Sequence, residues 1–128
     1  MKNLLFAFTI LLTLNSCSTF KSGLTIPARE TFLLGEFNDK NYSAELINKS
    51  NSTVIVKAVD KKSGEVTQNF GLAPKGKTKV YISKDETLYF ENENIRDVRI
   101  DVILNKGVEG MRYIKNGDTN RILIQTNL

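Results

Sequence analysis

Residues 71–83 read GLAPKGKTKVYIS, and this stretch decides between two different folds. Its first eight letters match G-x-x-x-x-G-K-[ST], the loop that cradles phosphates in nucleotide-binding proteins, where a helix must begin directly afterward. From Lys77 onward, apolar or β-branched residues instead alternate with polar ones, a pattern typical of a half-buried strand. Pro74 suits the first corner of a tight turn. We therefore interpret the stretch as strand, turn and strand, and we expect no nucleotide to bind there.

Short alternating segments closed by turn residues continue along the chain. VRIDVIL at 98–104 places four apolar side chains on one face, and TVIVKAVD at 53–60 is rich in β-branched residues. The expected strands are 31–37, 42–48, 53–60, 65–72, 77–83, 86–92, 98–104, 111–115 and 121–126. This series predicts an all-β fold, an antiparallel β-sandwich of about eight strands. An immunoglobulin-like or fibronectin-like topology is the first expectation, and a small β-barrel is the second.

The N-terminus, MKNLLFAFTILLTLNSC, combines one lysine, a short apolar stretch and a polar exit that ends in the only cysteine. The apolar stretch is too short to span a bilayer, and the arrangement is typical of a secretory signal peptide over residues 1–16. The exit Leu14-Asn15-Ser16-Cys17 resembles the lipobox of bacterial lipoproteins. That resemblance implies cleavage before Cys17, lipidation of its thiol with diacylglycerol, and acylation of the new amine.

Three segments follow from these patterns: a signal peptide at 1–16, a lipidated cysteine and flexible tether at 17–28, and a β-sandwich domain at 29–128. Residues 18–28 mix serine, glycine and proline without a clear period. No acidic residue follows Cys17 closely, and among lipoproteins this favours the outer membrane. We expect a protein of the bacterial cell envelope that faces the periplasm and is held to the membrane by its lipid.

Composition narrows the chemistry. The chain has no histidine, one cysteine and a formal net charge of +4. The usual proton shuttle and the commonest metal ligand are therefore missing, and the mild positive charge does not indicate nucleic acid. A cluster of acids could in principle supply a pair of catalytic carboxylates, but their spacing reads more simply as solvated positions: Glu86, Glu91, Glu93, Asp97 and Asp101. We expect no enzyme, no cofactor and no metal.

Lysines interleaved with tyrosines suggest one candidate ligand-binding face: Lys57, Lys75, Lys77, Lys79, Tyr81 and Tyr89. Lysine attracts anionic groups, and tyrosine can stack on sugar rings. The simpler reading is a strand face that lysine keeps soluble. The first functional expectation is a non-catalytic module that interacts with an envelope protein or has a structural role. The alternative is a protein that binds anionic glycan or lipid through the lysine-rich face.

Overall fold

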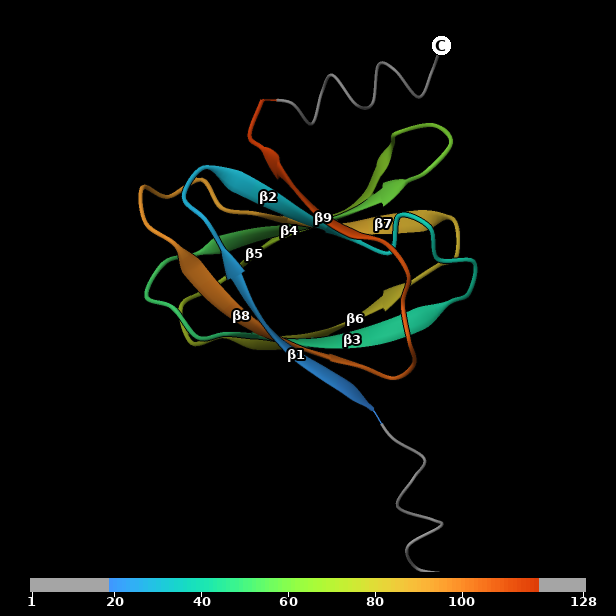
Figure 1. Ribbon diagram of the computed structural model, residues 1–128, viewed down its shortest axis with the longest axis horizontal. Coiled ribbons are helices and arrows are strands. Elements are labelled where there is room, and N and C mark those ends of the chain that lie inside the picture. The colour runs from blue at the N-terminus through green and yellow to red at the C-terminus, as the bar shows by residue number, and fades with distance from the viewer. Residues whose placement is uncertain (1–18, 118–128) are drawn as a thin grey trace, which may run out of the picture.

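The computed structural model describes residues 19–117, which fold into nine strands and no helix (Figure 1). The strands are β1 Phe20–Ile26, β2 Glu30–Leu34, β3 Tyr42–Asn48, β4 Val54–Asp60, β5 Val66–Leu72, β6 Lys77–Ile82, β7 Glu86–Glu91, β8 Val98–Leu104 and β9 Met111–Lys115. Within this part of the chain, therefore, no helix is long and apolar enough to cross a membrane. The expected strand at 121–126 lies outside the described residues.

Two antiparallel sheets face each other and form a sandwich, which confirms the predicted fold class. One sheet has the order β1-β8-β3-β6, and the other has the order β5-β4-β7-β2-β9. Apart from β9 at its edge, this arrangement is that of an eight-stranded jelly roll, in which most successive strands lie in opposite sheets and only β4 and β5 form a hairpin within one sheet. The immunoglobulin-like topology is therefore wrong, because β1 pairs with β8 instead of a strand near it in sequence. The expected barrel is also wrong, because the two sheets do not close on each other.

The tether prediction is wrong for residues 20–26, which form β1. This strand pairs with β8 along its whole length, from Phe20 opposite Leu104 to Ile26 opposite Val98. Ile26 is fully buried, and Leu24 is partly buried against the same core. The folded domain therefore begins about nine residues earlier than the sequence pattern predicts, since the expected start was residue 29.

The core lies between the sheets and consists of side chains that alternate inward from both. Its fully buried members include Phe90, Leu46, Ile100 and Val56. Phe90 packs against Phe32 with ring centroids 6.2 Å apart. Each such side chain stabilises the fold by about 1.5–3 kcal/mol relative to leaving it in water. Because apolar groups fill the space between the sheets, polar groups for a functional site lie at the ends and outer faces.

Strand register divides the molecule into two ends. One end, called here the proximal end, contains the start of β1 and the loops 35–41, 61–65, 83–85 and 105–110. The other end, called the distal end, contains the loops 27–29, 49–53, 73–76 and 92–97. In Figure 1 the proximal end is on the right and the distal end on the left.

Candidate functional site

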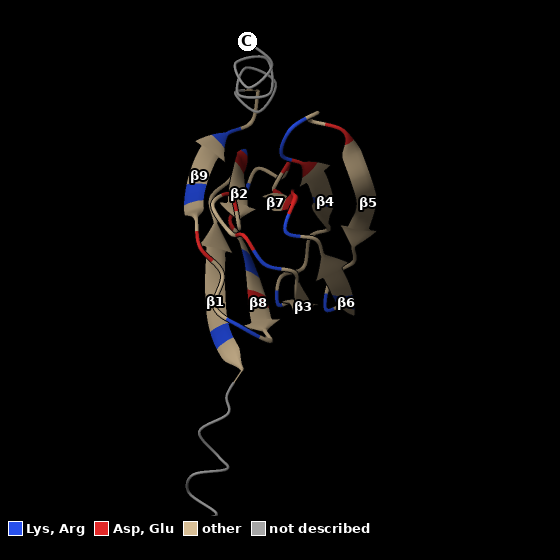
Figure 2. Cartoon of the chain, turned by 90° about the vertical axis from the view of Figure 1, so that its right-hand side faces the viewer, with Lys and Arg blue, Asp and Glu red and all other residues tan. Residues whose placement is uncertain are grey.

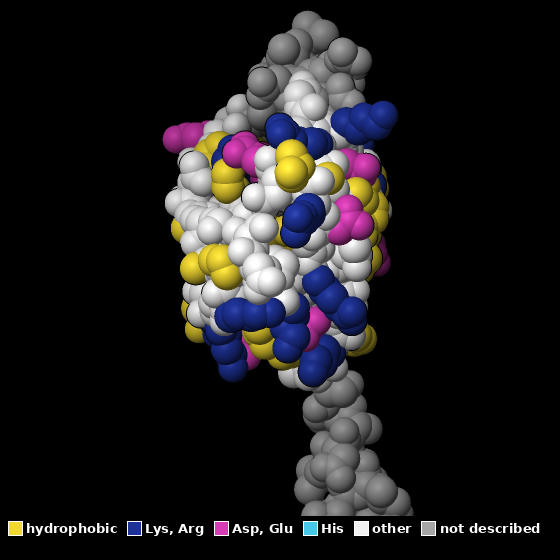
Figure 3. All heavy atoms as spheres, turned by 90° about the vertical axis from the view of Figure 1, so that its left-hand side faces the viewer, with side chains coloured by type: hydrophobic (Ala, Val, Ile, Leu, Met, Phe, Trp, Pro, Cys, Tyr) yellow, Lys and Arg dark blue, Asp and Glu magenta, His cyan; other side chains and the backbone are white. Residues whose placement is uncertain are grey.

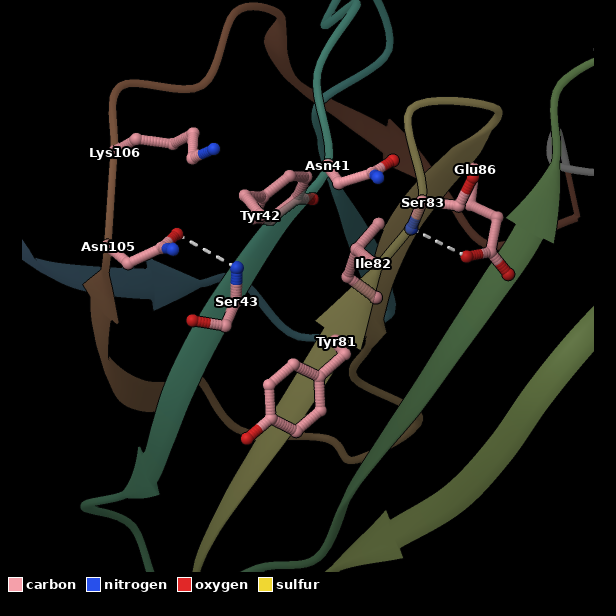
Figure 4. A pocket seen from close by; sticks show the side chains of 9 residues that line it. All are labelled: Asn41, Tyr42, Ser43, Tyr81, Ile82, Ser83, Glu86, Asn105 and Lys106. Carbon is pink, nitrogen blue, oxygen red and sulfur yellow. Dashed lines mark hydrogen bonds between the residues drawn. The ribbon is translucent and has the colours of Figure 1, made fainter.

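A pocket of about 550 Å³ opens at the proximal end (Figure 4). Its size falls within the range of small-molecule sites, about 300–1,000 Å³. Segments distant in sequence build it: the start of β3, the end of β6, the start of β7 and the residues that follow β8. Its lining comprises Asn41, Tyr42, Ser43, Tyr81, Ile82, Ser83, Glu86, Asn105 and Lys106.

Hydrogen bonds fix the walls of this pocket relative to one another. The Oδ1 atom of Asn105 accepts a hydrogen bond of 2.9 Å from the backbone N–H of Ser43, and the backbone N–H of Asn105 donates to the Ser43 carbonyl at 3.2 Å. The Oδ1 atom of Asn41 accepts from the backbone N–H of Lys84 at 2.8 Å. Both amides are held through their oxygen atoms, and neither NH₂ group has a hydrogen bond within residues 19–117. Two amide donors are therefore available to a ligand.

Glu86 has a structural role at the pocket wall. Its Oε1 atom accepts a hydrogen bond of 2.8 Å from the backbone N–H of Ser83, and its Oε2 atom accepts one from the hydroxyl of Thr67. Both carboxylate oxygens are thus occupied in holding the β6–β7 turn and β5. Tyr42, behind the same wall, has its pKa raised far above the ordinary range, first by burial of its hydroxyl and then by the negative charge of Glu86.

Tyr81 gives the pocket an exposed aromatic surface. Its side chain is 70% exposed on the outer face of β6. The ammonium of Lys79 lies 5.6 Å from the centre of its ring, within cation–π range. Lys106 brings a second positive charge to the pocket, and neither lysine forms a salt bridge within the described residues. An aromatic ring, free amide donors and unpaired cations together suit a ligand with sugar-like hydroxyls and a negative charge.

The six residues of the predicted lysine-rich face do not form one surface. Lys77, Lys79 and Tyr81 alternate along the outer face of β6, where Lys77 is paired with Glu45 at 2.8 Å. Lys75 lies in the β5–β6 turn at the distal end, where its ammonium donates to the carbonyl of Lys49 at 2.7 Å. Figure 3 looks onto the distal end and shows Lys and Arg side chains gathered low in the view. Lys75, at the distal end, is therefore separated from Tyr81, which lies toward the proximal end of β6 opposite Ser43.

Lys57 and Tyr89 lie on the other sheet altogether. They are register partners on the outer face of β4 and β7. Lys57 is paired with Glu91 at 3.1 Å, and Tyr89 is only 4% exposed because it packs with Leu33 and Val59. Burial also raises the pKa of Tyr89. The inclusion of these two residues in a binding face with Tyr81 is therefore wrong.

Sequence reasoning missed the polar residues that build the pocket: Asn41, Ser43, Ser83, Asn105 and Lys106. Each sits just outside or at the end of a strand, where asparagine and serine are ordinary turn residues. Only the pairing of β3 with both β6 and β8 brings them together. No local pattern in the sequence indicates that pairing.

The GLAPKGKT stretch forms a turn between β5 and β6, as predicted. Pro74 and Lys75 occupy the two corners, and the backbone N–H of Gly76 donates to the Ala73 carbonyl at 2.8 Å. Lys75 has φ of 61°, so the turn has the positive φ at its second corner that defines type II. A strand follows directly, where a phosphate-binding loop would require a helix.

The acidic residues considered as paired carboxylates are dispersed. Glu91 pairs with Lys57, and Asp97 accepts a hydrogen bond from the backbone N–H of Ala28 at 3.1 Å. Within residues 19–117, no group of three or more acidic residues is close enough to hold a metal ion. These positions fit the interpretation that the acids are solvated residues, of which Asp97 also forms a hydrogen bond to a neighbouring loop.

Comparisons with known proteins relate the chain by fold alone. No protein-family model matches the sequence, and no curated protein matches it. Among solved structures, RmlC from Streptococcus suis, determined in complex with dTDP-D-xylose, is similar with a TM-score of 0.51 at 10% identity. The match covers 74% of this chain and 47% of RmlC, so this chain spans about half the length of that protein. The capsular polysaccharide assembling protein CapF from Staphylococcus aureus matches with a TM-score of 0.44 at 12% identity, over 77% of this chain and 27% of CapF.

This likeness corrects one prediction. The absence of histidine and of a second cysteine led us to expect that the chain is not an enzyme. That exclusion is wrong, because it rested on composition alone, whereas the fold is shared with RmlC, a protein whose structure holds dTDP-D-xylose. The composition excludes catalysis by histidine, but it does not exclude catalysis by other side chains.

Proposed function

We propose that this protein binds an acidic saccharide in the proximal pocket. The single observation that carries the proposal is the exposed ring of Tyr81, which has the Lys79 ammonium over it and a polar pocket beside it. This arrangement supports the alternative drawn from the sequence, an anionic glycan ligand, and moves its site from a broad lysine face to one pocket. The shared fold with a protein that holds dTDP-D-xylose is in keeping with a ligand of this class.

Each side chain has a defined part in the proposed complex. The ring of Tyr81 stacks on the apolar face of a sugar, a contact that we take to be comparable to that of an aromatic pair, about 0.5–1.5 kcal/mol. The NH₂ groups of Asn41 and Asn105 donate to sugar hydroxyls, because their oxygens are already held by backbone N–H groups. Lys79 and Lys106 attract the carboxylate or phosphate of the saccharide. The hydrogen-bonded walls keep these groups in place before the ligand arrives, which lowers the entropic cost of binding.

The test is calorimetric titration of the purified protein with a tetramer of galacturonic acid, and with maltotetraose as the uncharged comparison. We expect the acidic tetramer to bind more tightly, and we expect Tyr81→Ala to weaken it about 2- to 10-fold, which corresponds to the loss of one stacking contact. Ile95→Ala is the matched control, because Ile95 is 78% exposed in a distal loop. Equal affinity of the wild type and Tyr81→Ala for the tetramer would contradict the proposed site.

Salt provides a second criterion. Binding that depends on lysine charges should weaken steeply between low and moderate ionic strength, because screening shortens the Debye length to about 8–10 Å. The first expectation from the sequence, an envelope protein partner, predicts a different outcome. In that case neither tetramer binds, and crosslinking in intact cells captures one discrete protein through this domain.

We further propose that the protein is an envelope lipoprotein anchored at Cys17, with the outer membrane as its site. The support is the resemblance of residues 14–17 to a lipobox, and these residues lie outside the described part of the chain. Radiolabelled palmitate should enter the wild-type protein and not Cys17→Ala. Equal labelling of both would disprove the anchor. Separation of inner and outer membranes by density then tests the location.

A further inference from the structure

The start of β1 limits how far the domain can stand from a lipid on Cys17. Phe20 is already part of a strand and pairs with Leu104. Only Ser18 and Thr19 lie between Cys17 and Phe20, so three Cα-to-Cα steps join them, and an extended chain spans at most about 3.6 Å per step. The Cα atom of Cys17 therefore lies within about 11 Å of that of Phe20. A flexible tether as long as the sequence pattern predicted would have let the domain stand farther from the lipid, whereas this short link keeps the start of β1 close to it.

The end of the sandwich nearest that link exposes two large aromatic side chains. Phe20 is 51% exposed and Phe37 is 72% exposed. Both lie against the 105–110 loop: a Cβ atom on Gly107 would lie 3.9 Å from the Phe20 ring, and one on Gly110 would lie 2.8 Å from the Phe37 backbone nitrogen. The backbone N–H of Phe37 also donates to the Glu109 carbonyl at 3.3 Å. Two exposed phenylalanines, one at the start of β1 and one in the 35–41 loop, that both contact the 105–110 loop suit insertion into an apolar boundary.

Charges around this end are mixed. Figure 2 looks onto the proximal end and shows Lys and Arg interspersed with Asp and Glu. Lys21 and Lys106 lie near Phe20, while Glu109 lies beside Phe37, and Glu36 is neutralised by Arg112 at 2.7 Å. Positive and negative charges at this end largely offset each other, so charge alone does not hold the whole end on an anionic membrane. The apolar side chains supply the main attraction, and the two lysines near Phe20 favour an anionic headgroup.

We infer that the proximal end lies on the membrane surface, with Phe20 and Phe37 in the lipid interface. This inference rests on the proposed lipidation of Cys17. Its consequence concerns the pocket, which opens at the same end through Asn105 and Lys106. A ligand then enters from the membrane side, so the saccharide that the pocket takes is the headgroup of a glycolipid.

The chain contains no tryptophan, so a single introduced tryptophan reports on one position only. Phe37→Trp places the reporter at the proximal end, and Ile95→Trp places the matched control in the distal 92–97 loop, where Ile95 is 78% exposed. Each lipidated mature protein, beginning at Cys17, is reconstituted into vesicles of phosphatidylethanolamine and phosphatidylglycerol that contain lipids brominated near the headgroup. Interfacial side chains reach about 5–10 Å into this region, which brings them to the bromines.

We expect severalfold quenching and a blue shift for Phe37→Trp, and emission like that of the vesicle-free protein for Ile95→Trp. Phe20→Trp provides a second proximal reporter should Phe37→Trp fold poorly. If the proteins co-float with vesicles while both positions stay unquenched, or are quenched equally, the orientation is wrong although the lipid anchor stands. If the proteins do not co-float and Cys17 carries no palmitate, the anchor is absent and this inference is overturned with it.

Discussion

Replacing Tyr42 by phenylalanine should stabilise the domain. Tyr42 is 3% exposed, and its hydroxyl has no hydrogen-bond partner within the described residues. Leaving a buried polar group unsatisfied costs about 1–3 kcal/mol, and replacing it with an apolar group of nearly the same shape recovers part of that cost. Little space opens, because only one oxygen atom is removed, at a point close to the backbone of Gly35, where an added Cβ would lie 2.9 Å from the hydroxyl. We expect a gain of about 1 kcal/mol in the free energy of unfolding.

Urea denaturation followed by circular dichroism measures this change, and thermal melting should show a rise of about 4–8 °C per kcal/mol. Tyr113→Phe is the matched control, because the Tyr113 hydroxyl donates to the carbonyl of Thr25 at 3.0 Å. That variant loses a satisfied but exposed bond and should cost about 0.5 kcal/mol, the low end for a hydrogen bond. If Tyr42→Phe destabilises the protein as much as Tyr113→Phe does, the Tyr42 hydroxyl is hydrogen-bonded in solution and the reasoning fails.

Gly35→Ala extends the same test. Gly35 has φ of +85°, which strains any L side chain, and its Cβ would meet both the Tyr42 hydroxyl at 2.9 Å and a methyl group of Val108 at 3.2 Å. The variant should therefore be destabilised in either background, and less so with phenylalanine at position 42, because one of the two contacts is then relieved. An equal cost in both backgrounds would mean that the Tyr42 hydroxyl does not contact the methyl group added at position 35.

Two further predictions concern the strand that the sequence pattern missed and the acid limit of stability. Ile26→Ala should cost about 2–5 kcal/mol in urea denaturation, because Ile26 is fully buried in the core; a cost near zero would mean that β1 is not docked. Backbone N–H groups of Ser63 and Lys62 hold the pKa of Asp60 below its ordinary value. The carboxylate therefore stabilises the fold above about pH 4. That contribution disappears as the pH falls through the lowered pKa. The wild type should therefore have a larger free energy of unfolding than Asp60→Asn at pH 6, and this difference should vanish in acid. A difference that does not depend on pH would refute this assignment.

Several strands were predictable because their alternation is uninterrupted. The segments 42–48, 98–104 and 111–115 match β3, β8 and β9 at both ends. β1 was missed because Ser22 and Gly23 interrupt its pattern, although Phe20, Leu24 and Ile26 share one face with Ser22. β1 forms because β8 provides its backbone hydrogen-bond partners, and the sequence of residues 20–26 does not predict that pairing. Tertiary pairing, not local propensity, decides such a strand.

The candidate site was only partly predictable for a related reason. Alternation shows that Tyr81 and Tyr89 both point away from the core, but it does not show to which sheet each strand belongs. The sheets separate them, so Tyr81 stays exposed beside Lys79, whereas Tyr89 is covered by Leu33 of the adjacent strand. The pocket depends on contacts such as that between Ser43 and Asn105, which are 62 residues apart.

The most direct test of the proposed site is a map of the residues that respond to an acidic saccharide. Backbone amide chemical shifts of the labelled protein, followed during titration with the galacturonic acid tetramer, provide it. The account predicts saturable shifts centred on Ser43, Tyr81 and Asn105, which lie around the pocket in Figure 4. Shifts centred instead on the distal loops near Lys75 and Lys49, or no saturable shifts at all, would contradict it.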